Sequence, residues 1–155
     1  MEFITILPKS KGKGVIMVVV DRITKYAHFC ALYFPFKFST ISTAFVETIQ
    51  KLHGNRNIIV SDKDPIFTRN FWTKLFSCLG TQLTHSSSYH PQYDEQTEIT
   101  NKCLEGHLCS FVYDKQTQWV KWLPIDKWWY NTSFHIATKM TPFMALYGYH
   151  PSSIT

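Results

Sequence analysis

Two carboxylates stand where a metal-dependent reaction could use them. Asp62 comes directly after a short apolar run at residues 59–61, which predicts the end of a buried strand. Glu98 lies where the turn-rich stretch 89–97 runs into a helix, and 35 residues lie between the two acids. An acid at a strand end and an acid on a helix can converge on one divalent cation, which takes several oxygen ligands from rigid elements. The pair therefore predicts metal-assisted phosphoryl transfer.

Each acid also has an ordinary interpretation when it is taken alone. An aspartate often begins a loop at a strand end, and a glutamate in the first turn of a helix is favoured by the helix dipole. The functional interpretation rests on the two acids together, at this separation and in these local settings.

The elements that must position these acids follow an α/β order. Alternating and apolar patterns predict strands, while capping residues such as Ser39 or Thr40, Thr68 and Asp94 predict helix starts. Gly54 and Gly80 are expected to end helices. The predicted strands are 3–7, 15–22, 26–33, 57–61 and 82–85, and the predicted helices are 40–53, 68–80, 94–113, 117–134 and a short one opening at Thr141. Three strands followed by alternating helices and strands predict a mixed sheet.

Length and composition restrict the class of protein. The 155 residues are enough for one domain with a real core, and 45% hydrophobic with 17% charged residues is typical of a globular chain. A net charge of +5 and a pI near 9.0 permit an acidic partner such as DNA. The four cysteines form no closely spaced pairs, no apolar run is long enough to cross a membrane, and no signal sequence opens the chain. We therefore expect an intracellular protein that is neither secreted nor bound to membranes.

Several segments resemble the catalytic core of integrases from Gypsy-type LTR retrotransposons, in the same order along the chain. These segments are residues 3–10, 18–29, 59–64, 89–98, 129–132 and 141–148. The resemblance implies an RNase H-like fold, a five-stranded mixed sheet flanked by helices, with the first strand truncated at the N-terminus. It also implies that residues 1–155 are one catalytic core domain, without the family's N-terminal zinc-binding and C-terminal DNA-binding regions.

The resemblance implies a catalytic site of three carboxylates holding two Mg²⁺ or Mn²⁺ ions. Asp62 and Glu98 match the second and third carboxylates of the family, and Glu2 stands where the family has an aspartate. The longer side chain of Glu2 is one departure, and Glu95 in place of a glycine is another. Asp21 is an alternative metal ligand if residues 3 and 19 pair across the hairpin; otherwise it would pair with Arg22 or Lys25.

The resemblance also implies partners. Lys102, Asn101, Gln92 and His90 are expected to contact DNA, both the ends of the element and the target, and the chain is expected to act in the nucleus as a homo-oligomer. Lys102 has an equally ordinary interpretation, because it lies four residues after Glu98 and could form a surface pair with it.

Two further groups of residues could serve as sites, but the ordinary interpretation is favoured for both. Trp122, Leu123, Ile125 and Trp129 fit a helix face that packs into the core, interrupted near Pro124, rather than a base-stacking surface. Cys103, His107 and Cys109 could share part of a helix face, but a structural zinc site normally has four closely spaced ligands.

Two functions from different classes fit the sequence. The first is an integrase catalytic domain that performs metal-dependent polynucleotidyl transfer, namely DNA 3′-end processing and strand transfer. The second is a catalytically inactive remnant of a retroelement that at most binds DNA or a partner subunit, which Glu2 and Glu95 favour. A cellular nuclease of the RNase H type is disfavoured by the family-like segment around Thr141.

Overall fold

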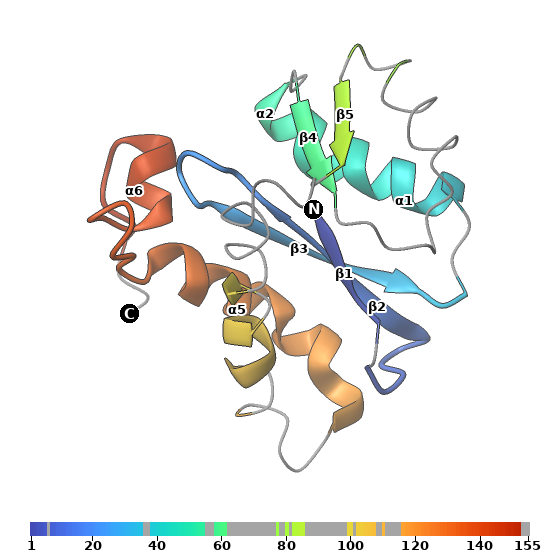
Figure 1. The fold of residues 1–155 in the computed structure, drawn as a ribbon. Helices are drawn as coiled ribbons and strands as arrows, with labels where there is room; N and C mark the ends of the chain where they lie inside the picture. Colours follow the sequence, from blue (N-terminus) through green and yellow to red (C-terminus); the bar gives the residue numbers. More distant parts are fainter. Residues whose placement is uncertain are drawn as a thin grey trace.

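The structure, a computed structural model, contains two small sheets. It describes residues 1–5, 7–35, 38–54, 58–61, 77, 80, 82–85, 99–100, 102–107, 110 and 116–152. Strands β1 (Glu2–Ile4), β2 (Lys13–Val20) and β3 (Ala27–Tyr33) form an antiparallel sheet in the order β1-β2-β3, and β4 (Ile58–Ser61) pairs in parallel with β5 (Gln82–His85) (Figure 1).

All five predicted strands are present, and the mixture of antiparallel and parallel pairs is confirmed. The first strand includes Glu2 and ends at Ile4, earlier than the predicted end at residue 7. Within the described residues no pairing joins the two sheets, so a single five-stranded sheet stays a prediction. The middle of β2 is fully buried from Val15 to Val18, as its continuous apolar run predicted.

One continuous helical stretch follows β3. It consists of α1 (Phe38–Phe45), a π-helical turn η1 (Val46–Gln50) and α2 (Lys51–His53). The stretch ends at Gly54, whose φ of 70° favours glycine, and the Gly54 N–H donates to the Gln50 carbonyl at 2.8 Å. The predicted end at Gly54 is confirmed, whereas Ser39 lies inside the first turn instead of capping it.

The second half of the chain contributes two further complete helices. The 3₁₀ turn η2 (Gln116–Gln118) leads into α5 (Trp119–Thr132), which continues through Pro124 rather than stopping there. Thr141 caps α6 (Pro142–Tyr147) as predicted, because its Oγ1 accepts from the Met144 N–H at 3.1 Å. Residues 99, 100, 102–107 and 110 are also helical, and we call them the Leu104 helix. The predicted helix at 68–80 lies outside the described residues, apart from residues 77 and 80.

The antiparallel sheet is covered on both faces. One face packs against α1 and η1 through an apolar cluster formed by Met1, Val15, Met17, Leu32, Ile41, Phe45 and Ile49. The other face packs against α5 and the Leu104 helix through Ile4, Ile16, Val18, Ala27, Phe29, Leu104, Trp119, Leu123 and Tyr130. Figure 1 shows α1 and α5 on opposite sides of β1–β3. These three layers are what an α/β chain needs to bury a sheet on both sides.

No helix within the described ranges has the length and apolar character needed to span a bilayer.

Candidate active site

The described structure brackets both predicted catalytic acids without including them. Strand β4 ends at Ser61, directly before Asp62, and the Leu104 helix is helical from residue 99, directly after Glu98. Asp62 and Glu98 themselves lie outside the described residues, as do three of the predicted DNA contacts, His90, Gln92 and Asn101.

The position of Glu2 on β1 can be read from its neighbours. Glu2 pairs with Val18 and is half-buried. Side chains alternate between the faces of a strand, and Ile4 belongs to the cluster that includes Leu104. The Glu2 side chain therefore lies on the sheet face covered by the Leu104 helix, which is the helix that follows Glu98.

The register between β1 and β2 corrects the alternative placed on Asp21. Phe3 pairs with Met17 rather than with residue 19, so Asp21 lies beyond the end of the β1–β2 ladder. The Asp21 Oδ2 accepts from the Thr24 hydroxyl at 2.7 Å and from the Thr24 N–H at 3.0 Å. Asp21 therefore orders the turn between β2 and β3.

The Leu104 helix presents two different sides. Thr100 and Leu104 are buried, whereas Lys102 is exposed. The Thr100 Oγ1 lies 2.8 Å from the Tyr130 hydroxyl on α5. Burial raises the pKa of Tyr130, and the bond to Thr100 opposes that rise. The inner side is thus tied to α5, and Lys102 is left accessible to a ligand in solvent.

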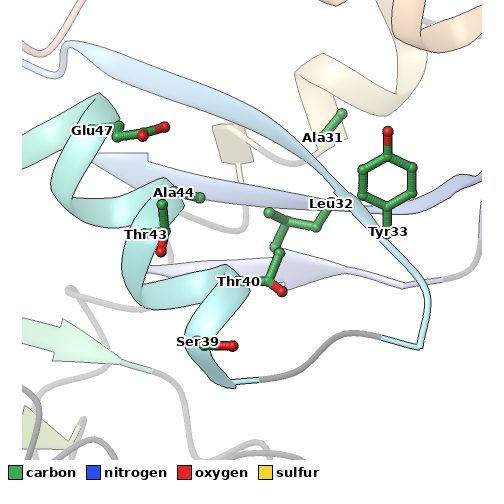
Figure 2. Close-up of a pocket in the computed structure, with 8 residues that line it drawn as sticks. All are labelled: Ala31, Leu32, Tyr33, Ser39, Thr40, Thr43, Ala44 and Glu47. Carbon is green, nitrogen blue, oxygen red and sulfur yellow. The ribbon is translucent and has the colours of Figure 1, made fainter.

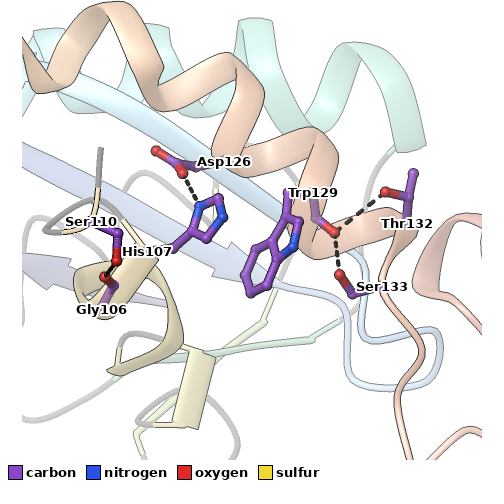
Figure 3. A network of polar contacts seen from close by, with 7 residues as sticks. All are labelled: Gly106, His107, Ser110, Asp126, Trp129, Thr132 and Ser133. Atoms are coloured by element: carbon purple, nitrogen blue, oxygen red, sulfur yellow. Dashed lines mark hydrogen bonds and ion pairs between the residues drawn. The ribbon is translucent and has the colours of Figure 1, made fainter. Parts of the chain in front are cut away.

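A histidine–aspartate pair forms a second tie between the same helices (Figure 3). The His107 Nδ1 bonds to the Asp126 Oδ1, and the His107 ring stacks on Trp129 with the two planes 8° apart. Asp126 is 1% exposed, and its Oδ2 has no hydrogen-bond partner among the described atoms. Burial raises the pKa of Asp126, and the bond to His107 opposes that rise.

This pair changes the interpretation of two predicted groups. His107 is held by Asp126, so its ring orients the helix, and the described residues contain no group of three or more possible metal-ligating side chains. Cys103 is an exposed free thiol, while Cys109 lies outside the described residues.

The buried face of α5 differs from the predicted one. Ile125 and Trp129 are 46% and 41% exposed, so that part of the prediction is wrong, while Leu123 is buried as predicted. The side chains that are buried recur every three to four residues, at Trp119, Leu123, Asp126, Tyr130 and Asn131. Two of them are polar, which is why an apolar pattern alone did not find this face.

Asn131 ties α5 to the start of β3. Its Oδ1 accepts from the Ala27 N–H at 2.8 Å, and its Nδ2 donates to the Ala27 and Lys127 carbonyls at 2.9 Å. Asn131 is 2% exposed, so it serves the fold. Nothing in the local sequence signals this role, since the partner is 104 residues away.

A buried network of two histidines and a lysine lies where α5 meets β3. The His28 Nε2 is 2.8 Å from the His53 Nε2, and the Lys127 Nζ is 3.1 Å from the His28 Nδ1. Burial lowers the pKa of Lys127. Lys127 extends from one side of the sheet to His28, whose partner His53 belongs to α2.

Comparison with known sequences gives a clear relation. The chain matches no established family profile. It is 33% identical over 152 residues to the Transposon Tf2-3 polyprotein of Schizosaccharomyces pombe, which covers 98% of this chain. The chain spans only 11% of the length of that polyprotein.

Comparison with solved structures gives the fold. A chain of the simian T-cell lymphotropic virus intasome, in complex with a PP2A regulatory subunit, superposes with a TM-score of 0.73 at 16% identity, covering 98% of this chain and 56% of that one. The HTLV-2 integrase catalytic core domain in complex with magnesium superposes with a TM-score of 0.69 at 16% identity, covering 93% of each chain.

The chain is a relative of Tf2 transposon polyproteins and has the fold of an integrase catalytic core. This confirms the resemblance that the spaced segments indicated, and it confirms the RNase H-like class of the fold. The match to the HTLV-2 core covers nearly the whole of both chains. The same integrase-core fold therefore frames the strand end before Asp62 and the helix after Glu98.

Proposed function

We propose that this integrase-core chain catalyses metal-dependent polynucleotidyl transfer, processing DNA 3′ ends and joining them to target DNA. The observation that carries the proposal is the superposition on the HTLV-2 integrase core over 93% of both chains. Asp62, Glu98 and Glu2 are the proposed catalytic and metal-binding residues.

The donor set of the proposed site suits Mg²⁺ or Mn²⁺. Three carboxylates offer only oxygen ligands, which these hard cations prefer. Glu2 lies on the sheet face covered by the Leu104 helix, and β4 ends directly before Asp62. When bound, the cations would lower the pKa of an attacking hydroxyl and offset charge on the phosphate. The HTLV-2 core is described in complex with magnesium, which supports the same requirement here.

Lys102 and the net charge support DNA as the substrate. The exposed Lys102 ammonium is a point charge that can pair with a phosphate oxygen, and the chain carries a net charge of +5. Asn101, Gln92 and His90 are proposed as further DNA contacts. Binding through phosphates weakens steeply as salt rises, so the salt dependence of binding tests this part of the proposal.

Assembly and location follow from the same proposal. The HTLV-2 core is described in dimeric and trimeric forms, and the simian virus protein belongs to an intasome. We extend to this chain a homo-oligomer that acts on DNA in the nucleus.

The second candidate function is an inactive remnant that at most binds DNA or a partner subunit. Glu2 favours it, because the extra methylene displaces a carboxylate that an active site must hold within about 0.5 Å. Strand β1 also has only three residues to fix that side chain.

Metal binding and strand transfer together test the proposal. Mg²⁺ or Mn²⁺ should raise the melting temperature, and Asp62→Asn should abolish the increase, while Glu105→Gln, an exposed acid on the Leu104 helix, should leave it unchanged. An increase that persists in Asp62→Asn would place the metal elsewhere.

A labelled duplex assayed in Mn²⁺ then separates the two functions. Joining by the unmodified chain excludes the remnant, and joining only after Glu2→Asp identifies Glu2 as the inactivating residue. If the metal response is present but neither form joins DNA, the remnant is the better description.

A further inference from the structure

Strand β3 forms the outer edge of the antiparallel sheet. The Tyr26 carbonyl accepts from the Asp21 N–H of the adjoining chain at 2.8 Å, and the Ala27 backbone instead bonds outward to Asn131. Antiparallel strands alternate in this way, so the backbone N–H and C=O of Ala31 also point outward, away from β2.

Helix α5 covers only one end of this edge. Asn131 imitates a neighbouring strand by bonding both backbone groups of Ala27, and Lys127 reaches the His28 ring next to it. Within the described ranges the outward groups of Ala31 have no partner. The edge is thus closed at Ala27 and open at Ala31.

A hollow of about 420 Å³ lies beside the open end (Figure 2). Pockets of roughly 300–1,000 Å³ hold small ligands, so this one has room for a pair of side chains but not for a folded element. It is lined by Ala31, Leu32, Tyr33, Ser39, Thr40, Thr43, Ala44 and Glu47. Glu47 is its only charged lining residue and has no ion-pair partner among the described residues.

The edge lacks the features that keep exposed strands from pairing. Natural edge strands are usually protected by lysine, proline, a bulge or a covering element. Strand β3 has no charged residue or proline between Ala27 and Tyr33, and its only register irregularity lies at its far end, opposite Lys13. Tyr33 is 56% exposed beside the hollow.

We propose that an extended peptide from a different protein adds to this edge as a strand and places a basic side chain next to Glu47. Backbone bonds to Ala31 would hold the peptide. Its residues opposite Leu32 and Cys30 would direct their side chains into the hollow, because Leu32 and Cys30 lie on the α1 face. The Cys30 Sγ is 3.3 Å from the Thr48 Oγ1, so the residue opposite Cys30 is the one near Glu47.

Charge decides between this partner and a second copy of the chain. Strand β3 has no lysine or arginine, so the β3 edge of another copy could not supply a cation to Glu47. The peptide should therefore carry lysine or arginine at one position and a small or hydroxyl side chain two residues away, against Thr40 and Thr43. This inference does not depend on the metal chemistry proposed above.

Fluorescence anisotropy with a defined probe tests the proposal. The probe is a nine-residue labelled peptide of alternating threonine and valine, with lysine at one central threonine position, and the protein is the 155-residue chain. Glu47→Gln should weaken binding by about two- to fivefold, as expected for an exposed ion pair. Glu105→Gln is the matched control and should change nothing.

Peptide variants make the test independent of protein folding. Methylating the backbone nitrogens that face β3 should weaken binding by about tenfold or more, because each methyl group removes a hydrogen bond and obstructs pairing. Amide exchange at Ala31 should slow when the peptide binds.

Absence of binding, or binding indifferent to backbone methylation, would overturn the proposal. So would protection of the Ala31 amide that rises with protein concentration alone, which would identify a second copy as the occupant.

Discussion

The two faces of the antiparallel sheet are held by different kinds of interaction. On the α1 face, the central contacts are apolar, with Ile41 and Phe45 packed onto Val15 and Met17. On the α5 face, an apolar cluster is supplemented by hydrogen bonds from α5 to other elements, namely those of Asp126, Tyr130 and Asn131.

This difference matters for positioning. Apolar packing is non-directional, so it fixes volume more strongly than it fixes the rotation of a helix. Hydrogen bonds have preferred distances and angles, so they fix which way a helix faces. The α5 face contains the Leu104 helix, which follows the proposed catalytic Glu98. The face that must place a catalytic acid is therefore the one with directional ties.

Ile41→Ala should have the largest effect on stability. Ile41 is fully buried in the α1-face cluster, and truncation of such a residue costs about 2–5 kcal/mol of unfolding free energy. Urea denaturation measures the loss. If the faces have separate roles, the melting response to Mg²⁺ should persist in this variant. Loss of that response would mean that α1 packing also positions the metal site.

Asn131→Ala should come next, with a loss of about 2–3 kcal/mol, because the buried Ala27 N–H and C=O lose their partner. Ser133→Ala, which removes a hydroxyl bond at the exposed end of the same helix, is the control and should cost no more than about 0.5 kcal/mol. Equal losses in the two variants would show that Asn131 is not a specific tie.

Tyr130→Phe should cost about 1 kcal/mol, since the buried Thr100 hydroxyl is left without its partner. Thr100→Val completes a double-mutant cycle, and the two losses should be less than additive because they break the same bond. The divalent-cation response should weaken more in Tyr130→Phe than in Ile41→Ala. The opposite order would contradict the positional role given to the α5 face.

Asp126→Asn should have the smallest effect, and its sign depends on pH. Burial raises the pKa of Asp126 in the folded protein, so folding favours the protonated form. The stability contributed by that form is complete below the unfolded pKa of about 3.9 and is lost as pH rises through the raised value. Melting temperatures should therefore fall in the wild type, relative to Asp126→Asn, as pH rises from about 4. A constant difference would show that the carboxyl is not perturbed; Glu105→Gln serves as the exposed control.

Part of the fold could be predicted from the sequence because the signals are local. The apolar run of β2, the stop at Gly54 and the cap at Thr141 depend on neighbours within a few residues, and all three are confirmed. Strand pairing was harder. The Phe3–Met17 pair differs by two residues from the predicted one, because the irregular connection between β1 and β2, with its Ser10–Lys13 bridge, sets the register.

The candidate site divides in the same way. The sequence alone determined which acids and which family-like segments the chain carries, since these are matters of residue type and spacing. Only the tertiary structure decided that Glu2 shares a sheet face with Leu104, that Asp126 meets His107, and that the β3 edge closes at Ala27. Polar contacts between residues far apart leave no periodic pattern in the chain, because each needs only one donor and one acceptor brought together by packing.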